Sequence, residues 1–375
     1  MRTSSNRSGK WLIAAPILTA VLFADSVALP EDVAPALAKH MASAAEKDNF
    51  SGSIVVTKNG QALLCEGYGF ANRDHEIRNT PQTKFRIGSV TKQFTAMAVM
   101  ILQERGKLKV DDPVSKYLDD APKAWDGITI HHLLSHTSGI PSYTGFPQMM
   151  SRTVRLQATV DEVIATFQDK PLEFSPGERF AYSNSGYHLL GKIIEKASGQ
   201  DYETFLREAI LQPLELKDTG YDQAATILPG RAAGYARTPK GLANAQYIDM
   251  SWPYAAGAIY STVEDLARWD QALSAGKLVG PGSYQAMYTP VKQNYGYGWM
   301  IRDRSGRKEI SHNGGIHGFS SSLVRYPDDK LCIVVLSNII PAPTDRIAHE
   351  LAAIVLGESA AEAKGAEKKS EPKCD

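Results

Sequence analysis

A serine and a lysine three positions apart are the first candidates for chemistry in this chain. Ser89 and Lys92 lie at the predicted start of an apolar helix over residues 89–105. Residues at this spacing share one face of a helix, so the lysine amine can contact the serine hydroxyl. A serine beside a lysine of lowered pKa is an activated nucleophile, and a helix N-terminus favours a developing oxyanion. The pair therefore indicates acyl transfer through Ser89.

The Ser-x-x-Lys spacing alone is a weak signal, because it recurs at three other places in the chain. The context of Ser89 distinguishes it, since a glycine precedes it and a long apolar helix follows. Two rarer motifs lie further along the chain, and each also has a structural explanation. Tyr182-Ser183-Asn184, the only Tyr-x-Asn, precedes a predicted helix over 185–197 and could form its cap. His312-Asn313-Gly314, the only His-x-Gly, ends a predicted strand over 308–312 that stops at Gly314-Gly315.

With all three motifs in this order, the chain resembles the serine β-lactamase and penicillin-binding protein superfamily. The nearest resemblance is to the branch with class C β-lactamases, D-alanyl-D-alanine carboxypeptidases, D-aminopeptidases and β-lactamase-like carboxylesterases. The resemblance extends from a predicted hairpin at Asn59-Gly60 to a predicted helix over residues 347–356. Further stretches that support it are Leu133–Pro141, Gly257–Leu266, Tyr295–Trp299 and His312–Asn338.

The resemblance implies a role for each motif residue. Ser89 would be the acylated nucleophile and Lys92 its proton partner. Tyr182 would be the general base or proton shuttle, with its phenol pKa lowered by nearby cations, Lys92 first among them. Water would then hydrolyse the acyl-enzyme, and neither a metal nor an organic cofactor is required.

The resemblance also implies the substrate-binding groups. Asn184 would hold the substrate's amide, and the strand carrying His312, Asn313 and Gly314 would run beside the site. The backbone N–H groups of Ser89 and Gly315 would form the oxyanion hole.

One departure bears on the substrate. Class C β-lactamases carry Lys-Thr-Gly where this chain has His312-Asn313-Gly314. A lysine is a permanent cation suited to a carboxylate, whereas a histidine with a pKa of ~6.5 is mostly neutral at pH 7. We therefore expect a secreted D-alanyl-D-alanine carboxypeptidase, D-peptidase or β-lactamase-related penicillin-binding enzyme. The alternatives are a carboxylesterase acting on small esters and a penicillin-binding sensor without turnover.

Three other features of the sequence bear on the kind of site. His131, His132 and His136 could suggest zinc, but no glutamate follows in His-Glu-x-x-His fashion, and a helix end before a turn explains them better. An α/β-hydrolase would need Gly-x-Ser-x-Gly, which the chain lacks. Trp252 and Tyr254 fall in a predicted loop that could line the substrate cleft.

The predicted elements place strands near both ends of the chain and helices between them. One hairpin turns at Asn59-Gly60, the strongest short hairpin signal, and a second spans 320–337. The fold class is therefore α+β: an antiparallel sheet built from both termini, flanked by helices, with a large, mostly helical insert. The expected division is a sheet sub-domain of residues 29–88 plus 300–357 and a helical sub-domain of residues 89–299.

Composition indicates a folded protein and gives no electrostatic reason to expect a nucleic-acid partner. The 375 residues are 43% hydrophobic and 22% charged, and 41 basic side chains balance 41 acidic ones. Such a balance provides no field that would collect nucleic acid. Three cysteines are too few for a disulfide framework. The expected partner is a small-molecule or peptide substrate.

Both termini are expected to lie outside the folded unit. Residues 1–28 combine three basic residues, an apolar run over 11–23 and Ser26-Val27-Ala28, the layout of a secretory signal peptide. This predicts export to the periplasm or the medium, with no membrane span left after cleavage. Residues 358–375 are rich in Ala, Lys and Glu and predict a disordered, charged tail.

Overall fold

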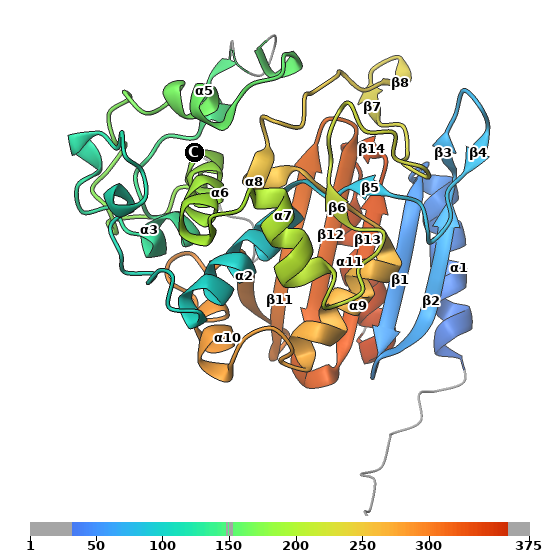
Figure 1. Cartoon of the computed structure of the whole chain (residues 1–375). Coiled ribbons are helices and arrows are strands. Elements are labelled where there is room, and N and C mark those ends of the chain that lie inside the picture. The colour runs from blue at the N-terminus through green and yellow to red at the C-terminus, as the bar shows by residue number, and fades with distance from the viewer. Residues whose placement is uncertain (1–31, 148, 150–152, 359–375) are drawn as a thin grey trace, which may run out of the picture. The chain divides into compact units, whose positions relative to one another are not determined.

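The central element is a six-stranded antiparallel sheet in the order β10-β11-β12-β13-β1-β2. The computed structural model describes residues 32–147, 149 and 153–358. Strand β1 pairs with β13 along its whole length, so strands from the two ends of the described chain lie side by side (Figure 1). This confirms the predicted fold class. The six strands are Gly52–Lys58, Gln61–Tyr68, Met300–Arg304, Arg307–Ile316, Phe319–Tyr326 and Leu331–Ser337, for β1, β2, β10, β11, β12 and β13.

The turns of this sheet agree with the sequence in two places and differ in one. Asn59 and Gly60 form the β1–β2 turn with φ angles of 52° and 77°. Residues 327–329 form the turn between β12 and β13, as expected. The strand predicted over 308–312 was expected to stop at Gly314-Gly315. That end was wrong, because β11 continues to Ile316. Both glycines pair with serines of β12, which keeps the backbone extended past them.

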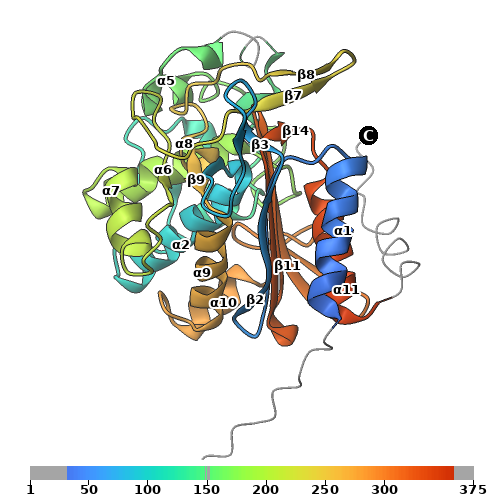
Figure 2. The same ribbon diagram turned by 90° about the vertical axis from the view of Figure 1, so that its right-hand side faces the viewer.

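Two helices cover one face of the sheet, as Figure 2 shows with the sheet nearly edge-on. They are α1, Val33–Lys47, and α11, Thr344–Leu356. Leu37 and Met41 of α1 pack with Ile347 and Leu351 of α11 in one apolar cluster against the sheet, and all four are fully buried. The apolar residues that recur along α1 and α11 therefore form the faces with which these two helices pack on the sheet.

A second, larger apolar cluster lies on the opposite face of the sheet (Figure 2). Helix α2, Thr91–Glu104, is buried along most of its length, and it packs against the helices α6 and α8. Helix α9, Val263–Ser274, packs on strands β1 and β13. The remaining helices of this layer are α3 Ile130–Leu134, α5 Val160–Ala165, α6 Asn184–Ser198, α7 Tyr202–Leu206, α8 Tyr254–Gly257 and α10 Pro281–Met287.

Outside the six-stranded sheet, the described chain also contains short strands that the sequence did not predict. Strand β9 pairs with β5 just before the Ser89 turn and with β6 on its other side, so it anchors the approach to the candidate nucleophile. The short strands are β3 Phe70–Asn72, β4 Ile77–Arg78, β5 Phe85–Arg86, β6 Gly220–Tyr221, β7 Tyr235–Thr238, β8 Gly241–Asn244, β9 Ile259–Ser261 and β14 Ile339–Ile340. The short 3-10 helices include Gly88–Val90, Tyr143–Gly145 and Thr153–Arg155.

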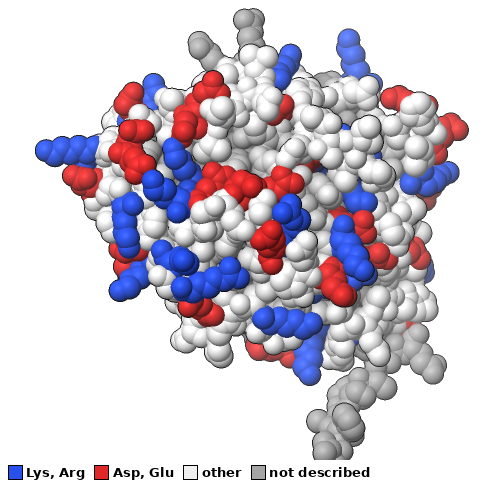
Figure 3. All heavy atoms as spheres, viewed as in Figure 1, with Lys and Arg blue, Asp and Glu red and all other residues white. Residues whose placement is uncertain are grey.

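Two predictions concern the termini. The predicted signal peptide of residues 1–28 and all but the first residue of the predicted tail fall outside the described residues. The sub-domain boundaries at 88 and 299 stay a prediction. No helix in the described ranges is long and apolar enough to cross a membrane. Basic and acidic side chains intermingle on the face drawn in Figure 3.

Leu351 tests whether the outer apolar cluster stabilises the fold independently of the candidate site. We expect Leu351→Ala to lower the free energy of unfolding by about 2–5 kcal/mol, because it leaves a cavity at a fully buried position. Urea denaturation measures this change. Ile354→Ala on the same helix is the control and should cost less, since that side chain is only partly buried. A Leu351→Ala cost no larger than that of the control would contradict this assignment.

Candidate active site

Ser89 lies in a tight turn between a strand and a helix. Strand β5 ends at Arg86, residues Gly88–Val90 form a 3-10 turn, and α2 begins at Thr91 rather than at the predicted position 89. Gly88 has a left-handed φ of 51°, and a Cβ there would come within 3.0 Å of the Gly315 nitrogen. Only glycine satisfies both conditions without strain, so Gly88 allows β11 to approach the serine closely.

Lys92 reaches back along the same helix face to Ser89. Its Nζ lies 3.1 Å from Ser89 Oγ, 2.8 Å from Asn184 Oδ1 and 2.8 Å from the Ala256 carbonyl oxygen. These acceptors come from three separate elements, α6, α8 and the Ser89 turn. The structure therefore brings the predicted serine, lysine and asparagine together.

The Lys92 amine is fully buried and has no anionic partner. Within the described ranges no Asp or Glu forms an ion pair with it. Burial lowers the pKa of Lys92 well below its ordinary value, because the charged form loses its hydration. A neutral amine can donate two N–H groups to Asn184 and Ala256 and direct its lone pair at the Ser89 hydroxyl. This geometry suits Lys92 to accept the serine proton.

Tyr182 lies on the other side of the amine. The ring centroid is 4.8 Å from Lys92 Nζ. The residue exposes 39% of its surface, and its phenol is close enough to Ser89 for that hydroxyl to affect the phenol pKa. Burial raises the pKa of the Tyr182 phenol. The predicted lowering was wrong, because burial outweighs the opposing effect of Ser89 and favours the protonated phenol.

Asn184 begins helix α6 and connects two parts of the site. Its side-chain oxygen accepts from Lys92, and its Nδ2 donates to Thr144 Oγ1 at 3.1 Å. The helix cap is Ser183, whose hydroxyl accepts from the Gly186 N–H. Asn184 is therefore held in one orientation from both ends of its amide.

Strand β11 passes close to the Ser89 turn. Its pairing with β10 ends at Ser311, so beyond that point β11 pairs only with β12. A Cβ at Gly314 would lie 2.1 Å from the Ile87 oxygen and 3.0 Å from the Ser89 nitrogen. Gly315 lines the same pocket as Ser89. This placement is compatible with the expected oxyanion hole.

His312 is close to the site but fully occupied by its neighbours. Its Nδ1 lies 2.5 Å from the Asn313 carbonyl oxygen, which can only accept, so Nδ1 carries the proton. Its Nε2 therefore accepts from the Tyr295 hydroxyl at 3.0 Å. Burial and Lys92 lower the pKa of His312 to about 3, so the ring is neutral at pH 7.

Asn313 does not enter the site with its side chain. Alternation along β11 directs it away from His312, and its Nδ2 donates to Asp345 of α11 at 2.8 Å. The Asn313 side chain therefore contacts α11 and does not line the Ser89 pocket, because adjacent side chains of a strand point to opposite faces. A role for Asn313 in substrate binding stays a prediction.

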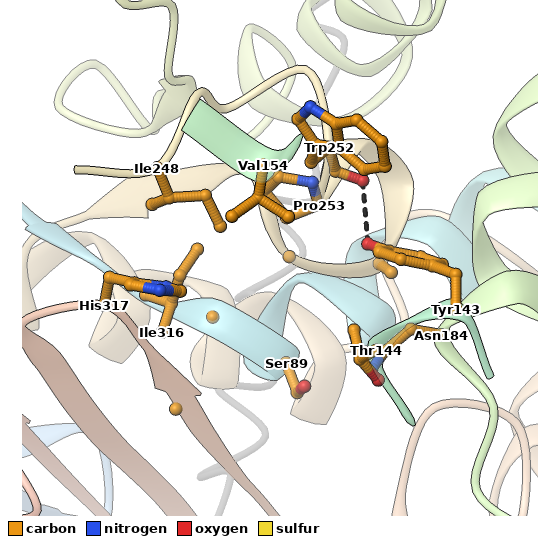
Figure 4. Close-up of a pocket in the computed structure, with 14 residues that line it drawn as sticks. Ser89, Tyr143, Thr144, Val154, Asn184, Ile248, Trp252, Pro253, Ile316 and His317 are labelled. Carbon is orange, nitrogen blue, oxygen red and sulfur yellow. Dashed lines mark hydrogen bonds between the residues drawn. The ribbon is translucent and has the colours of Figure 1, made fainter. Parts of the chain in front are cut away.

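A pocket with an empty volume of about 490 Å³ opens over Ser89 (Figure 4). Its roof comes from two loops that hydrogen bonds tie together, among them Trp252 Nε1 to the Leu156 oxygen and Asp249 N–H to the Val154 oxygen. Trp252 lines the pocket as predicted, whereas Tyr254 is buried with its hydroxyl on Glu195. The lining residues that the sequence analysis missed include Tyr143, Thr144, Val154, Ile248, Pro253, Ile316 and His317.

The sheet, the helical layer and the Ser89–Lys92 pair together are the architecture of a serine hydrolase. Residues 34–357 match the family model described as Beta-lactamase, and the chain belongs to this family. It is 31% identical over 318 residues to penicillin-binding protein 4* of Bacillus subtilis (strain 168), covering 78% of this chain and 69% of that protein.

Solved structures agree with this family. The octameric penicillin-binding protein homologue from Pyrococcus abyssi has a TM-score of 0.75 and 32% identity, covering 87% of this chain and 78% of that one. A D-stereospecific amidohydrolase from Streptomyces sp. has a TM-score of 0.72 and 26% identity, covering 86% of this chain and 99% of that one. Both likenesses extend over most of the described fold.

Gly314 tests the close approach of β11 to the nucleophile. We expect Gly314→Ala to slow the labelling of Ser89 by a fluorophosphonate probe by ~10²-fold, because its Cβ displaces the strand from the Ser89 turn. Gly282→Ala is the matched control, since a Cβ there meets open space and should leave labelling unchanged. Equal labelling rates in the two variants would show that the contact does not position the site.

Proposed function

We propose that this chain hydrolyses peptides of D-amino acids through an acyl-enzyme on Ser89, in the manner of a D-alanyl-D-alanine carboxypeptidase or D-peptidase. The observation that carries the proposal is the 3.1 Å contact between Ser89 Oγ and a buried Lys92 amine without an anionic partner. The likeness to a penicillin-binding protein and to a D-stereospecific amidohydrolase supports it.

In the proposed acylation, Lys92 takes the proton of Ser89 as Oγ attacks the substrate carbonyl carbon. The N–H groups of Ser89 and Gly315 stabilise the oxyanion. The protonated Tyr182 phenol gives its proton to the leaving nitrogen and recovers one from the Lys92 ammonium. In deacylation, the same two groups remove a proton from the attacking water and return it to Ser89 Oγ.

The pocket chemistry bears on the acyl group. Among the described residues, none of the 14 that line it is an Asp, Glu, Lys or Arg. Apolar side chains of Val154, Ile248, Trp252 and Ile316 form much of its wall (Figure 4). Burying an uncharged, apolar group there is favourable, whereas an ionic group would lose its hydration without a partner. We infer that the substrate presents an uncharged group to this pocket.

A second candidate function follows from the state of His312. A neutral ring with both nitrogens engaged offers no cation to a substrate carboxylate. This favours substrates recognised without such a carboxylate, and a carboxylesterase acting on small esters is therefore the alternative. Export of the chain is also proposed, and it rests on the predicted signal peptide alone.

Lys92 is tested by the rate at which Ser89 becomes acylated. We expect Ser89→Ala to abolish fluorophosphonate labelling and Lys92→Met to slow it by ~10²–10⁴-fold, because the proton acceptor is lost. In the wild type, labelling should slow as the pH falls through the lowered pKa of Lys92, since the ammonium cannot accept a proton. Intact-mass spectrometry follows the adduct.

The control is Lys277→Met, which removes an exposed lysine of another Ser-x-x-Lys sequence and should label normally. Undiminished labelling of Ser89→Ala would refute the nucleophile, and undiminished labelling of Lys92→Met would refute its partner.

A substrate panel distinguishes the candidate functions. We expect turnover of D-Ala-D-Ala peptides and D-amino-acid amides, with L-isomers much slower. Turnover of p-nitrophenyl esters alone would favour the carboxylesterase. A lasting adduct with a penicillin, without turnover of any member of the panel, would indicate a sensor. Continuous absorbance assays and intact mass provide both measurements.

A further inference from the structure

The histidines of residues 131–136 do not share a ligand, because each contacts a different part of the fold. His131 Nδ1 lies 2.6 Å from the Tyr297 hydroxyl, and His132 Nδ1 accepts from the Thr129 N–H at 3.1 Å. His136 Nδ1 accepts from the Ser183 N–H, also at 3.1 Å. Across the described ranges no three His, Cys, Asp or Glu side chains are grouped as metal ligands would be. Of the three histidines, only His136 contacts the Tyr182 segment.

His136 binds the backbone on both sides of Tyr182. Its carbonyl oxygen accepts from the Ala181 N–H at 2.9 Å, and its Nδ1 accepts from the Ser183 N–H. Its ring also packs on the Tyr182 ring, with centroids 4.2 Å apart and planes 37° apart. Three contacts therefore converge on the one residue whose phenol reaches Ser89.

The backbone conformation of His136 allows its carbonyl and its ring to contact the Tyr182 segment together. The residue is 1% exposed and has a left-handed φ of 56°, which turns its carbonyl and its ring toward the same segment. Because a backbone N–H can only donate, Nδ1 must be the unprotonated nitrogen and the proton must lie on Nε2. That Nε2 is buried and finds no acceptor among the residues with described positions. The ring is thus held as a neutral acceptor.

We propose that His136 is a positioning residue for Tyr182, which sets the phenol against Ser89 by accepting the Ser183 N–H. The proposal rests on the proposed function for its effect on turnover. Burial lowers the pKa of His136 well below its ordinary value, and the neighbouring basic groups Lys92 and His312 lower it further. A protonated ring could not accept from Ser183, so the neutral form is the one that holds the segment.

Two substitutions remove the imidazole ring, and only one of them keeps a hydrogen-bond acceptor for the Ser183 N–H. In His136→Asn, the Oδ1 atom occupies the place of Nδ1, and asparagine tolerates a left-handed φ. His136→Leu keeps an apolar volume but has no acceptor. We expect kcat for a D-Ala-D-Ala peptide to fall by ~10²-fold in His136→Leu with KM little changed, because only the reacting groups are misplaced. His136→Asn should retain most of the wild-type kcat.

Amide hydrogen exchange tests the position independently of activity. The Ser183 amide should lose protection in His136→Leu and keep it in His136→Asn. The Ala181 amide is the internal control, because it bonds the main-chain oxygen of residue 136 in every variant. His132→Leu is the matched control protein and should leave both amides and kcat unchanged. If His136→Leu fails to fold, His136→Gly replaces it, since glycine adopts a left-handed φ without strain and has no side-chain acceptor.

The outcomes are distinguishable. Wild-type kcat in His136→Leu, or an equal loss in the Asn and Leu variants, would overturn the positioning role. Unchanged Ser183 exchange in His136→Leu would also overturn it. If the wild type neither labels at Ser89 nor turns over any substrate, the proposed function fails. In that case an exchange difference between the two variants still supports the placement of Tyr182 by His136.

Discussion

The burial of the Lys92 amine without a counterion is the constraint on which the rest of the site depends. An ammonium ion at this depth would cost several kcal/mol in lost hydration, whereas a neutral amine keeps its hydrogen bonds to Asn184 and the Ala256 carbonyl. Burial, with Lys92 acting in the same direction, also lowers the pKa of His136 and of His312, so both rings are neutral at pH 7. In the proposed mechanism, the uncharged amine is what allows Lys92 to accept the proton of Ser89 Oγ.

The fold brings this cluster together from distant parts of the chain. Ser89 comes from the turn before α2, Lys92 from the first turn of α2, and Asn184 from the start of α6. Gly315 comes from the part of β11 that β10 leaves unpaired. Two glycines permit the contact between the Ser89 turn and the strand, because any Cβ at 88 or 314 would meet backbone. The outer layer of α1 and α11 supports the sheet from behind without entering the site.

Local signals in the sequence predicted the parts of this architecture that depend on short spacing. Asn59-Gly60 predicted its hairpin, and the Ser89–Lys92 spacing predicted a contact within one helical turn. The extent of β11 was missed because glycines weaken a strand signal, and only the pairing of Gly314 and Gly315 with Ser321 and Ser320 of β12 keeps this backbone extended. The pocket roof comes from loops around Val154 and Ile248 that meet only in the folded chain. The direction of the Tyr182 pKa shift depends on burial, which its motif does not encode.

The charge of Lys92 is the most direct test of this account. Carbon-13 NMR of the protein labelled in lysine follows the Cε resonance of Lys92 as the pH is raised, with Lys92→Met to assign it. The account predicts a titration far below the ordinary lysine value of about 10.4, so that the amine is neutral at pH 7. A Lys92 resonance that titrates near the ordinary value would contradict it, because a permanently charged amine could not accept the proton of Ser89.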